Sequence, residues 1–177
     1  MDKTFERLYD RYHTNLFQFL FYMVKNRAIA EELVQEVYIN VLHSYDKYEE
    51  RSNEKTWLFA IARNIAIDYL RTHNRRTSRW LSKFDFNKQQ PTDESPLPEE
   101  ILLQKEEVQA IYKCLRECTL DQQQVLILRY IQELSINETA EILNWSVSKV
   151  KTTQHRAIKA LRDLVDDPSK NQLKGVL

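Results

Sequence analysis

Glycine is almost missing from this sequence, since Gly175 is the single glycine among 177 residues. The tight turns that join β-strands often require glycine at positive φ, so its scarcity disfavours a sheet-rich fold. Glycine-rich phosphate-binding loops, of both the GxGxxG and the P-loop type, cannot be formed with one glycine. The scarcity therefore excludes Rossmann and P-loop chemistry and favours an all-α protein.

The sequence also lacks the cysteine pattern of a disulfide-bonded or zinc-binding protein. Its two cysteines, Cys114 and Cys118, are four residues apart on one predicted helix. One helical turn is poor geometry for a disulfide, and two thiols without neighbouring histidines do not form a zinc site. Both thiols are therefore predicted to be reduced and partly buried.

Long hydrophobic runs are missing as well. The most apolar stretch, residues 16–24, contains Gln18 and is far too short to cross a bilayer. The charged N-terminus lacks the apolar segment of a signal peptide, so a cytoplasmic location is expected. The four histidines are scattered and no HExxH motif occurs, although a lone Asp10-x-x-His13 keeps a helical metalloenzyme as a weak alternative. No catalytic residue, metal site, cofactor or small-molecule substrate is therefore expected.

Net charge is zero, with 26 basic and 26 acidic residues, which disfavours a uniformly basic nucleic-acid-binding protein. The charges are nevertheless separated into blocks along the chain. The net charge is −5 over residues 28–54, +5 over 55–79, −5 over 85–107 and +5 over 149–162. Hydrophobic residues make up 42% of the chain, which is enough for a packed core between such charged surfaces.

Apolar residues at three- and four-residue spacing predict three helices in the first part of the chain. They run from Phe5 to Met23, from Ala30 to Tyr45 and from Trp57 to Leu70, with Ser52 or Asn53 as the N-cap of the third. These helices are expected to share one core, in a domain over residues 1–80. Three of the four prolines then fall within residues 88–98, which predicts a flexible linker over 81–98.

A second helical domain is predicted over residues 99–177. A helix resumes near Glu99, and the sequence Thr119-Leu-Asp-Gln122 forms a capping box for a helix over 120–131. A second capping box, Ser135-Ile-Asn-Glu138, begins a short helix that ends at Asn144, a residue that tolerates the left-handed conformation. Ser146 caps the last helix, so residues 135–161 follow the helix-turn-helix plan.

The last helix carries five basic residues and no acid between positions 149 and 162. Lys149 lies in the first turn, where the helix dipole disfavours a cation unless a phosphate is nearby. Thr152, Thr153 and His155 add short donors and acceptors that suit base edges. A solvated basic face on an ordinary helical hairpin is the alternative to a DNA-reading helix.

The third helix carries six basic residues and one acid between positions 55 and 79. Trp57 lies on its apolar stripe and is predicted to be buried. The opposite face is predicted to be free to meet a ligand, and it carries Thr56, Phe59, Arg63, Asn64 and Ile67. Basic side chains interleaved with aromatic rings suit single-stranded nucleic acid, because bases stack on the rings.

Acidic and amide side chains gather at the start of the second helix, at Glu31, Glu32, Gln35 and Glu36. The helix dipole favours acids there, so a solvated helix start is one interpretation. A docking surface for a basic protein is the other.

Taken together, these segments resemble the extracytoplasmic-function (ECF) class of bacterial RNA polymerase sigma factors. Ala30-Glu-Glu-Leu-Val-Gln-Glu-Val-Tyr38 resembles region 2.2, which binds the polymerase clamp helices. Residues 56–66 and Asp68-Tyr-Leu-Arg71 resemble the helix that meets the −10 element, and residues 48–55 match the loop that captures a flipped base. Leu126-Ile-Leu-Arg-Tyr130, Val150-Lys151 and His155-Arg156-Ala157 resemble region 4, which reads the −35 element.

The resemblance implies an all-α fold of two small domains, the second a four-helix domain, and three sets of contact residues. Core polymerase is expected to contact Glu31, Glu32, Leu33, Gln35, Glu36 and Tyr38. The −10 element is expected to contact Arg51, Ser52, Asn53, Lys55, Thr56, Phe59, Arg63, Asn64, Ile67, Arg71, Arg75 and Arg76. The −35 element is expected to contact Ser146, Ser148, Lys149, Lys151, Thr152, Thr153, His155, Arg156 and Lys159.

The resemblance also implies the partners of the chain: core RNA polymerase, promoter DNA and an anti-sigma factor, often membrane-bound, that would hold the protein at the membrane. Asn144 departs from a common family glycine, and Gln154 from a common apolar residue. A classical dimeric helix-turn-helix regulator that acts without polymerase is the main alternative. A protein–protein adaptor is a third, but it leaves both basic segments unexplained.

Overall fold

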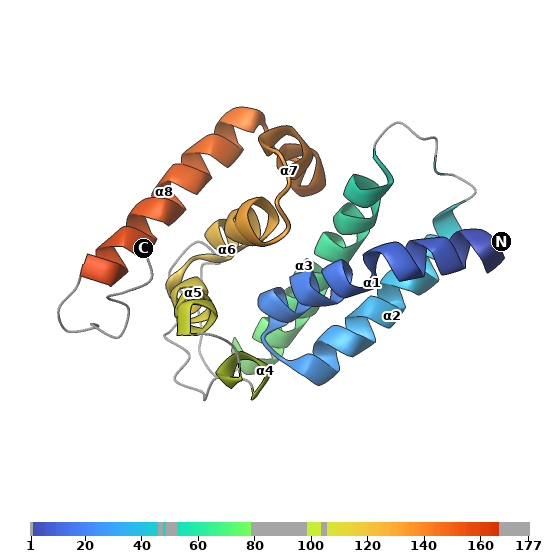
Figure 1. The fold of residues 1–177 in the computed structure, drawn as a ribbon, viewed down its shortest axis with the longest axis horizontal. Coiled ribbons are helices and arrows are strands. Elements are labelled where there is room, and N and C mark those ends of the chain that lie inside the picture. The colour runs from blue at the N-terminus through green and yellow to red at the C-terminus, as the bar shows by residue number, and fades with distance from the viewer. Residues whose placement is uncertain (1, 46–47, 49–52, 79–98, 104–105, 167–177) are drawn as a thin grey trace.

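The computed structural model describes residues 2–45, 48, 53–78, 99–103 and 106–166, and these residues form helices without a β-strand (Figure 1). The all-α prediction is confirmed. The helices are α1 (Asp2–Val24), α2 (Arg27–Ser44), α3 (Glu54–Ser78), α4 (Glu99–Leu102), α5 (Glu106–Glu117), α6 (Leu120–Leu126), the π-helical η2 (Ile127–Ile131), α7 (Ile136–Leu143) and α8 (Val147–Asp166). The predicted linker, 81–98, lies outside the described residues.

Helices α1, α2 and α3 pack against one another, as their apolar spacing predicts. The turn between α1 and α2 uses Lys25 at a φ of 58°, and Asn26 then caps α2 by accepting a hydrogen bond from the Ile29 N–H at 3.0 Å. Asn53 begins α3 in the same way, because its side chain accepts from the Lys55 N–H at 2.9 Å. Of the two predicted caps for α3, Asn53 is therefore confirmed, whereas Ser52 lies outside the described residues.

The second half of the chain departs from the prediction in two places. The helix expected to resume near Glu99 is divided into α4 and α5. The helix expected over 120–131 changes its winding after Leu126, since its last five residues form a π-helix in which the Gln132 N–H donates to the Ile127 carbonyl at 2.9 Å. The wider turn places both Ile127 and Leu128 in the core, at full burial.

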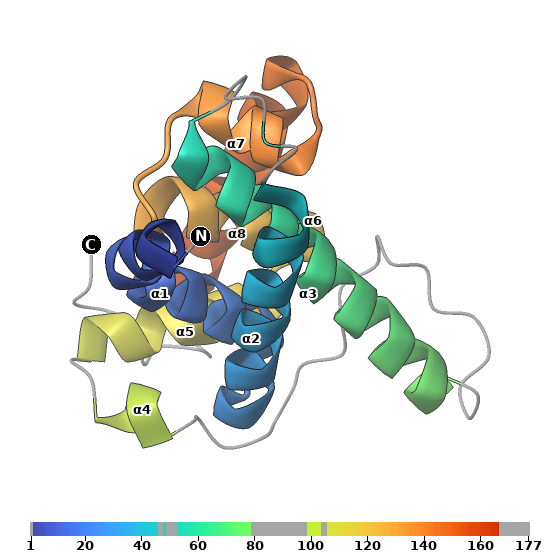
Figure 2. The same cartoon turned by 90° about the vertical axis from the view of Figure 1, so that its right-hand side faces the viewer.

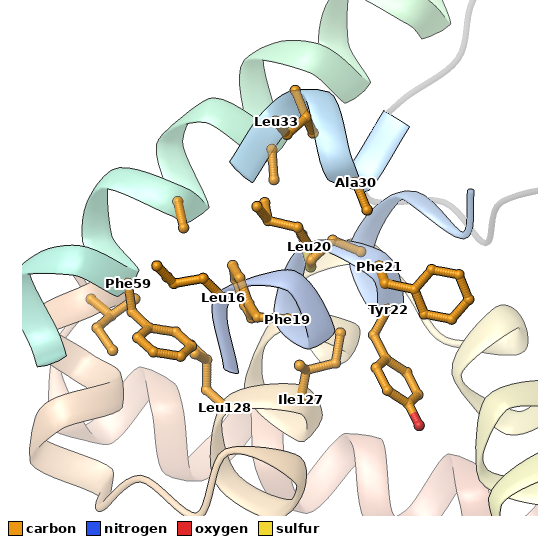
Figure 3. Close-up of a cluster of buried hydrophobic side chains, with 14 of the residues drawn as sticks. Leu16, Phe19, Leu20, Phe21, Tyr22, Ala30, Leu33, Phe59, Ile127 and Leu128 are labelled. Carbon is orange, nitrogen blue, oxygen red and sulfur yellow. The ribbon is translucent and has the colours of Figure 1, made fainter. Parts of the chain in front are cut away.

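Both halves of the molecule contribute to one hydrophobic core. Helix α3 packs against α7, and α1 packs against η2, and both views show the N-terminal part of α3 beside α7 (Figures 1 and 2). Phe19 of α1 and Phe59 of α3 meet edge to face, 5.4 Å apart, in the same cluster as Leu128 of η2 (Figure 3). The second half therefore covers one side of α3 and α1, a contact that local sequence patterns do not predict.

Candidate nucleic-acid and protein interfaces

The helix-turn-helix predicted from residues 135–161 is confirmed in its local geometry. Ser135 accepts a hydrogen bond from the Glu138 N–H at 3.2 Å, and Glu138 accepts one from the Ser135 N–H at 2.8 Å. These bonds hold the pKa of Glu138 below its ordinary value, because they favour the carboxylate form. Asn144 adopts the left-handed conformation (φ 53°, ψ 46°), and the Trp145 N–H donates to the Ala140 carbonyl at 2.9 Å. The capping box and the left-handed residue together fix where α7 begins and ends.

Helix α8 begins with the predicted Ser146 cap, and two of its residues anchor it in the core. The Ser146 hydroxyl accepts from the Lys149 N–H at 3.1 Å, and Val150 and Ala157 are fully buried. Because Val150 and Ala157 face the core, the positions on the opposite side of α8 face the solvent. Of the predicted −35 residues, Thr153 is half-buried, and the others are exposed: Ser146, Ser148, Lys149, Lys151, Thr152, His155, Arg156 and Lys159. The structure thus brings this whole set together on one accessible helix face.

Lys149 has compensation within the chain for its unfavourable place in the first turn. Its ammonium lies 3.7 Å from the centre of the Trp145 ring and 3.8 Å from a carboxylate oxygen of Asp121. Trp145 itself is half-buried against the core. A phosphate is therefore not required to explain Lys149, although the cation stays exposed and available to one.

Gln154 has a defined structural partner that the sequence did not reveal. The Arg129 Nε donates to Gln154 Oε1 at 3.0 Å, and the same guanidinium donates through Nη1 to the Leu134 carbonyl. Arg129 therefore connects η2, the segment before α7 and helix α8. A polar residue at position 154, where an apolar one is common, is accounted for by this contact.

The prediction that one face of α3 is free to meet a ligand is wrong in this structure. Thr56, Phe59 and Ile67 are 1%, 0% and 5% exposed, and Arg63 is half-buried. The physical reason is that apolar side chains on that face, above all Phe59, join the core that the two halves share. Asn53, Asn64 and Arg71 are exposed, and Figure 2 shows the C-terminal part of α3 projecting from the rest of the molecule.

The remaining −10 candidates divide into those with described contacts and those without. The Lys55 ammonium donates to the Gln132 carbonyl at 3.3 Å and lies 5.9 Å from the Phe59 ring centre. Trp57 is half-buried, with its ring 4.7 Å from that of Tyr48, which agrees with its predicted role in packing. Arg51 and Ser52 lie outside the described residues, as do the side chains of Arg75 and Arg76.

The start of α3 is fixed to α1 by an ion pair. The Arg7 guanidinium donates to both carboxylate oxygens of Glu54, at 2.6 and 2.8 Å. These hydrogen bonds hold the pKa of Glu54 below its ordinary value. The pair positions the end of the loop that the family resemblance assigns to a flipped base.

The predicted docking residues of α2 separate into an exposed and a buried group. Glu31, Glu32, Gln35 and Glu36 are exposed, but Tyr38 is 5% exposed and is packed against Phe5 with ring centres 5.4 Å apart. Tyr38 is therefore a core residue in this structure, and its contact with core polymerase stays a prediction. Leu33, also 5% exposed, reaches the surface only as part of the wall of a hollow between α2 and α3.

Two exposed apolar residues on α2 were missed by sequence reasoning. Ile39 and Leu42 are 54% and 41% exposed, and helical spacing places them on the same side as Glu32 and Gln35. Leu42 had been expected in the core, whereas Ile39 lies outside the apolar stripe, and this position was the available signal. We refer to Glu32, Gln35, Glu36, Ile39 and Leu42 as the α2 strip.

A hollow of about 360 Å³ adjoins the α2 strip. Its walls combine apolar, acidic and aromatic side chains from α2 and α3: Leu33, Glu36, Ile65, Asp68, Tyr69, Thr72 and His73. Such a mixture can accept an apolar side chain that ends in a positive charge.

Two family comparisons cover most of this helical architecture. The Sigma-70 region 2 family matches residues 8–76, which include α3 and the α2 strip, and the Sigma-70, region 4 family matches residues 108–161, which include the helix-turn-helix. The chain belongs to the sigma-70 family of RNA polymerase sigma factors. Within it, the chain is similar to ECF sigma factors: it is 54% identical over 162 residues to the ECF RNA polymerase sigma factor SigX of Bacillus subtilis (strain 168), covering 92% of this chain and 84% of that relative.

A second relative and two solved structures agree with this assignment. The RNA polymerase sigma factor YlaC of Bacillus subtilis (strain 168) is 34% identical over 152 residues, covering 86% of each chain. The fold is similar to that of the sigma factor RpoE crystallised with the anti-sigma factor NepR from Bartonella quintana, with a TM-score of 0.72, 24% identity, and coverage of 94% of this chain and 99% of that one. It is also similar to CnrH in complex with the cytosolic domain of CnrY, at a TM-score of 0.69 and 22% identity, over 94% of this chain and 90% of that one.

The described residues contain neither a membrane-spanning helix nor a metal-binding cluster. Across the helices of the described residues, none combines the length and the apolar character needed to cross a bilayer. In that same part of the chain, no three His, Cys, Asp or Glu side chains lie close enough together to hold a metal ion. The two thiols are buried and reduced, as predicted, and burial raises the pKa of Cys118 to about 12.

Proposed function

We propose that this sigma factor is a dissociable, non-enzymatic specificity subunit that binds core RNA polymerase in the cytoplasm and directs it to promoters. The observation that carries the proposal is the exposed basic face of α8 between positions 149 and 162, which carries no acid and belongs to the second helix of a capped helix-turn-helix. An α-helix of this kind fits the major groove, and its N-terminal residues then face the base edges. An adaptor without a nucleic-acid partner leaves that face unexplained.

We propose that α8 reads the −35 element. Lys149, Lys151 and Arg156 carry charge near the N-terminal half of the helix, and Thr152 and His155 lie between them on the exposed face. Lys159 and Arg162 follow toward the C-terminal end, where phosphate contacts would fix the register without reading sequence. The partial burial of Thr153 makes it a weaker base-contact candidate than Thr152.

We propose that α3 holds the −10 element once the second half of the chain has moved away from it. Exposed Asn64 and Arg71 are accessible already, whereas Thr56, Phe59 and Arg63 require that movement. The loop before α3 would capture an extruded base through Arg51, Ser52, Asn53 and Lys55. Such a pocket offsets part of the cost of unstacking a base, a few kcal/mol.

We propose that the α2 strip docks on core polymerase, and that it does so on a basic segment with apolar side chains. Its acidic residues provide electrostatic steering, and Ile39 and Leu42 provide the apolar area that the acids alone lack. We also propose an anti-sigma factor as a further partner, since the sigma factor RpoE, which has a similar fold, was crystallised with the anti-sigma factor NepR. A membrane-bound anti-sigma factor would place the chain at the inner face of the membrane.

Charge reversal on the α2 strip tests the docking proposal. We expect Glu36→Lys combined with Ile39→Glu to weaken binding to core polymerase about tenfold or more in a fluorescence-anisotropy titration, because one attractive charge and one apolar contact are lost. Glu141→Lys, an exposed charge reversal on α7, serves as the control and should bind core normally. Equal affinities for both variants and the unmodified protein would remove the strip from the interface.

A gel-shift assay separates the sigma-factor proposal from a classical dimeric helix-turn-helix regulator. The sigma-factor proposal expects weak shifts of genomic promoter fragments by the free protein and strong, specific shifts once core polymerase is added. A dimeric regulator shifts a palindromic site tightly without polymerase. Tight specific binding in the absence of core would therefore favour the regulator.

A further inference from the structure

Helix α8 needs a defined rotation about its own axis if its exposed side chains are to meet base edges. Its core contacts come from one inward row, on which Val150 and Ala157 are fully buried. Apolar contacts of this kind are non-directional, so they hold the helix against the core without fixing its rotation. The rotation of α8 therefore depends on directional contacts with the neighbouring helices.

Gln154 makes such a contact at the middle of the basic face. Its Oε1 accepts a hydrogen bond from the Arg129 Nε at 3.0 Å, and no other α8 side chain in the described part of the chain hydrogen-bonds to another helix. Helical spacing places Gln154 at the edge of the inward row, one turn from Lys151 and next in sequence to His155. The bond thus holds α8 at the level of the side chains proposed to meet the −35 bases.

Arg129 is suited to fix geometry because it holds two acceptors at once. Its guanidinium is a planar fork of donors, and Nη1 donates to the Leu134 carbonyl while Nε donates to Gln154. Leu134 is 2% exposed and immediately precedes Ser135, the N-cap of α7. Arg129 therefore ties both helices of the helix-turn-helix to one point.

The backbone that carries Arg129 is itself fixed to the core. Arg129 lies in the π-helical turn η2, whose wider winding buries Ile127 and Leu128 and leaves Arg129 half-buried beside α8. After this turn, Glu133 takes a φ of 55°, and the Leu134 N–H donates to the Leu128 carbonyl at 3.0 Å. The guanidinium thus projects from a well-anchored segment toward α8.

A small rotation of α8 would disturb base contacts more than phosphate contacts. Side-chain tips lie about 5–6 Å from a helix axis, so a rotation of about 20° moves them by about 2 Å. Hydrogen bonds from a short side chain such as Thr152 do not survive that displacement. Lys151 and Arg156 can follow a phosphate, because their stems are long and flexible. The rotation of α8 therefore controls sequence discrimination rather than total DNA affinity.

We propose that Arg129 and Gln154 are positioning residues for promoter reading, a pair that fixes the rotation of α8 without touching DNA. The effect on promoter reading rests on the proposed −35 role of α8, whereas the fixed rotation does not. Loss of the pair leaves the basic side chains on the surface, so binding to DNA of any sequence persists while the preference among −35 sequences weakens.

Two substitutions that conserve net charge break the pair from either side. Arg129→Lys keeps the cation but replaces the planar fork by a single ammonium, and Gln154→Leu removes the acceptor at similar volume. The two combined should have about the effect of either alone, since both remove the same contact. Gln154→Glu keeps an acceptor for Arg129 and should retain the discrimination. Arg11→Lys on α1, where the side chain is exposed, is the matched control.

Binding of the full chain with core polymerase to promoter fragments randomised in the −35 element measures the discrimination. We expect the affinity ratio between the preferred sequence and its single-base variants to fall about fivefold or more in Arg129→Lys and in Gln154→Leu, the size of one lost base contact, and to stay unchanged in Arg11→Lys. The slope of log affinity against log salt should stay the same in these three variants, because no charge is lost. Partial unfolding lowers both affinities equally, so the ratio separates positioning from stability.

Nuclear magnetic resonance of the free chain tests the rotation of α8 without DNA. Relaxation dispersion at the amides of residues 151–156 should reveal exchange between orientations of the helix in Arg129→Lys and in Gln154→Leu. The same amides should show no new exchange in Arg11→Lys.

The outcomes separate the pair from the proposed function. New exchange in α8 together with weakened discrimination supports the positioning role. An α8 without new exchange, an unchanged affinity ratio, or an equal loss of affinity for every −35 sequence overturns it. New exchange in variants of a protein that shows no preference among −35 sequences upholds the fixed rotation and counts against the −35 role of α8.

Discussion

Asn144 sets the entry of the recognition helix because it is the residue at which the chain reverses between α7 and α8. Its φ of 53° is a conformation that asparagine tolerates, glycine adopts freely, and residues with an ordinary β-carbon disfavour. The orientation of the basic face of α8 therefore depends on a single backbone conformation.

We expect Asn144→Ala to destabilise the protein by about 1 kcal/mol and Asn144→Gly to leave it at least as stable as the unmodified chain. Urea unfolding followed by circular dichroism measures both changes. Asn137→Ala, an exposed position within α7, is the matched control and should change the free energy of unfolding by less than about 0.5 kcal/mol. A larger loss in Asn144→Gly than in Asn144→Ala would contradict the left-handed assignment.

Two carboxylates make stability depend on acidic pH. Hydrogen bonds from Arg7 and Ser135 lower the pKa of Glu54 and of Glu138 below the ordinary value of 4.5. A group whose pKa is lower in the folded than in the unfolded state stabilises the fold above the unfolded pKa, and this contribution is lost as the pH falls through the folded pKa. We expect the free energy of unfolding to decline as the pH falls below 4.5.

The substitutions Glu54→Gln and Glu138→Gln should make that decline shallower, since each removes one titrating carboxylate. Glu138→Gln is the more informative of the two, because glutamine can keep the capping-box hydrogen bond without the charge. Urea titrations between neutral and acidic pH give the measurement. An unchanged acid decline in the double variant would show that other carboxylates control it.

At the scale of one element, α8 combines a buried anchor row with an exposed basic row. We expect Lys151→Ala combined with Arg156→Ala to weaken binding of the polymerase complex to a −35-containing promoter and to reduce the slope of log affinity against log salt by roughly 2, because two phosphate or base contacts are lost. Lys3→Ala combined with Arg11→Ala removes the same charge from α1, where both side chains are exposed. The expected slope for that control equals the slope of the unmodified protein, and equal slopes for all three would take α8 out of the DNA interface.

The individual elements also show which features can be predicted from local sequence. Both capping boxes and the left-handed Asn144 follow from residues within a few positions of one another, and all are confirmed. The π-helical winding at Ile127 was not predicted, because periodicity in a short apolar run does not distinguish a π-turn from an α-turn. The exposure of Leu42 was missed because helical spacing alone does not show where an apolar stripe leaves the core, and Ile39 lies outside that stripe.

At the scale of the whole molecule, the contacts that local periodicity cannot reveal are those between the halves. Arg63 and Gln124 are 61 residues apart in sequence, and the sequence around either residue does not predict the hydrogen bond between them. Helical spacing places Phe59 on the side of α3 that faces away from the apolar stripe of that helix. Spacing alone cannot show that a distant part of the chain covers this side, so Phe59 was predicted to be exposed although it is fully buried. The described structure therefore adds one major fact to the sequence prediction, which is that the two halves share a core.

The zero net charge is the sum of basic and acidic blocks that lie on different helices. Residues 55–78 of the first basic block lie on α3 and the basic block at 149–162 lies on α8, and the acidic block at 28–54 includes the α2 strip. Opposed charges partly cancel beyond a Debye length of about 8 Å at physiological salt, so we expect unspecific DNA binding by the free chain to be weak. With the −10 surface of α3 covered as well, the chain alone is expected to be a poor DNA-binding protein.

Transcription in vitro tests the central claim most directly. Core RNA polymerase from a bacterium with a similar sigma factor, such as Bacillus subtilis, is combined with the purified chain on fragmented genomic DNA. The 5′ ends of the transcripts are then mapped. The account predicts new, discrete start sites that core alone does not use, and fewer such transcripts with Lys151→Ala combined with Arg156→Ala. The absence of any start site that depends on the added chain would contradict the assignment of this chain as a promoter-specificity subunit.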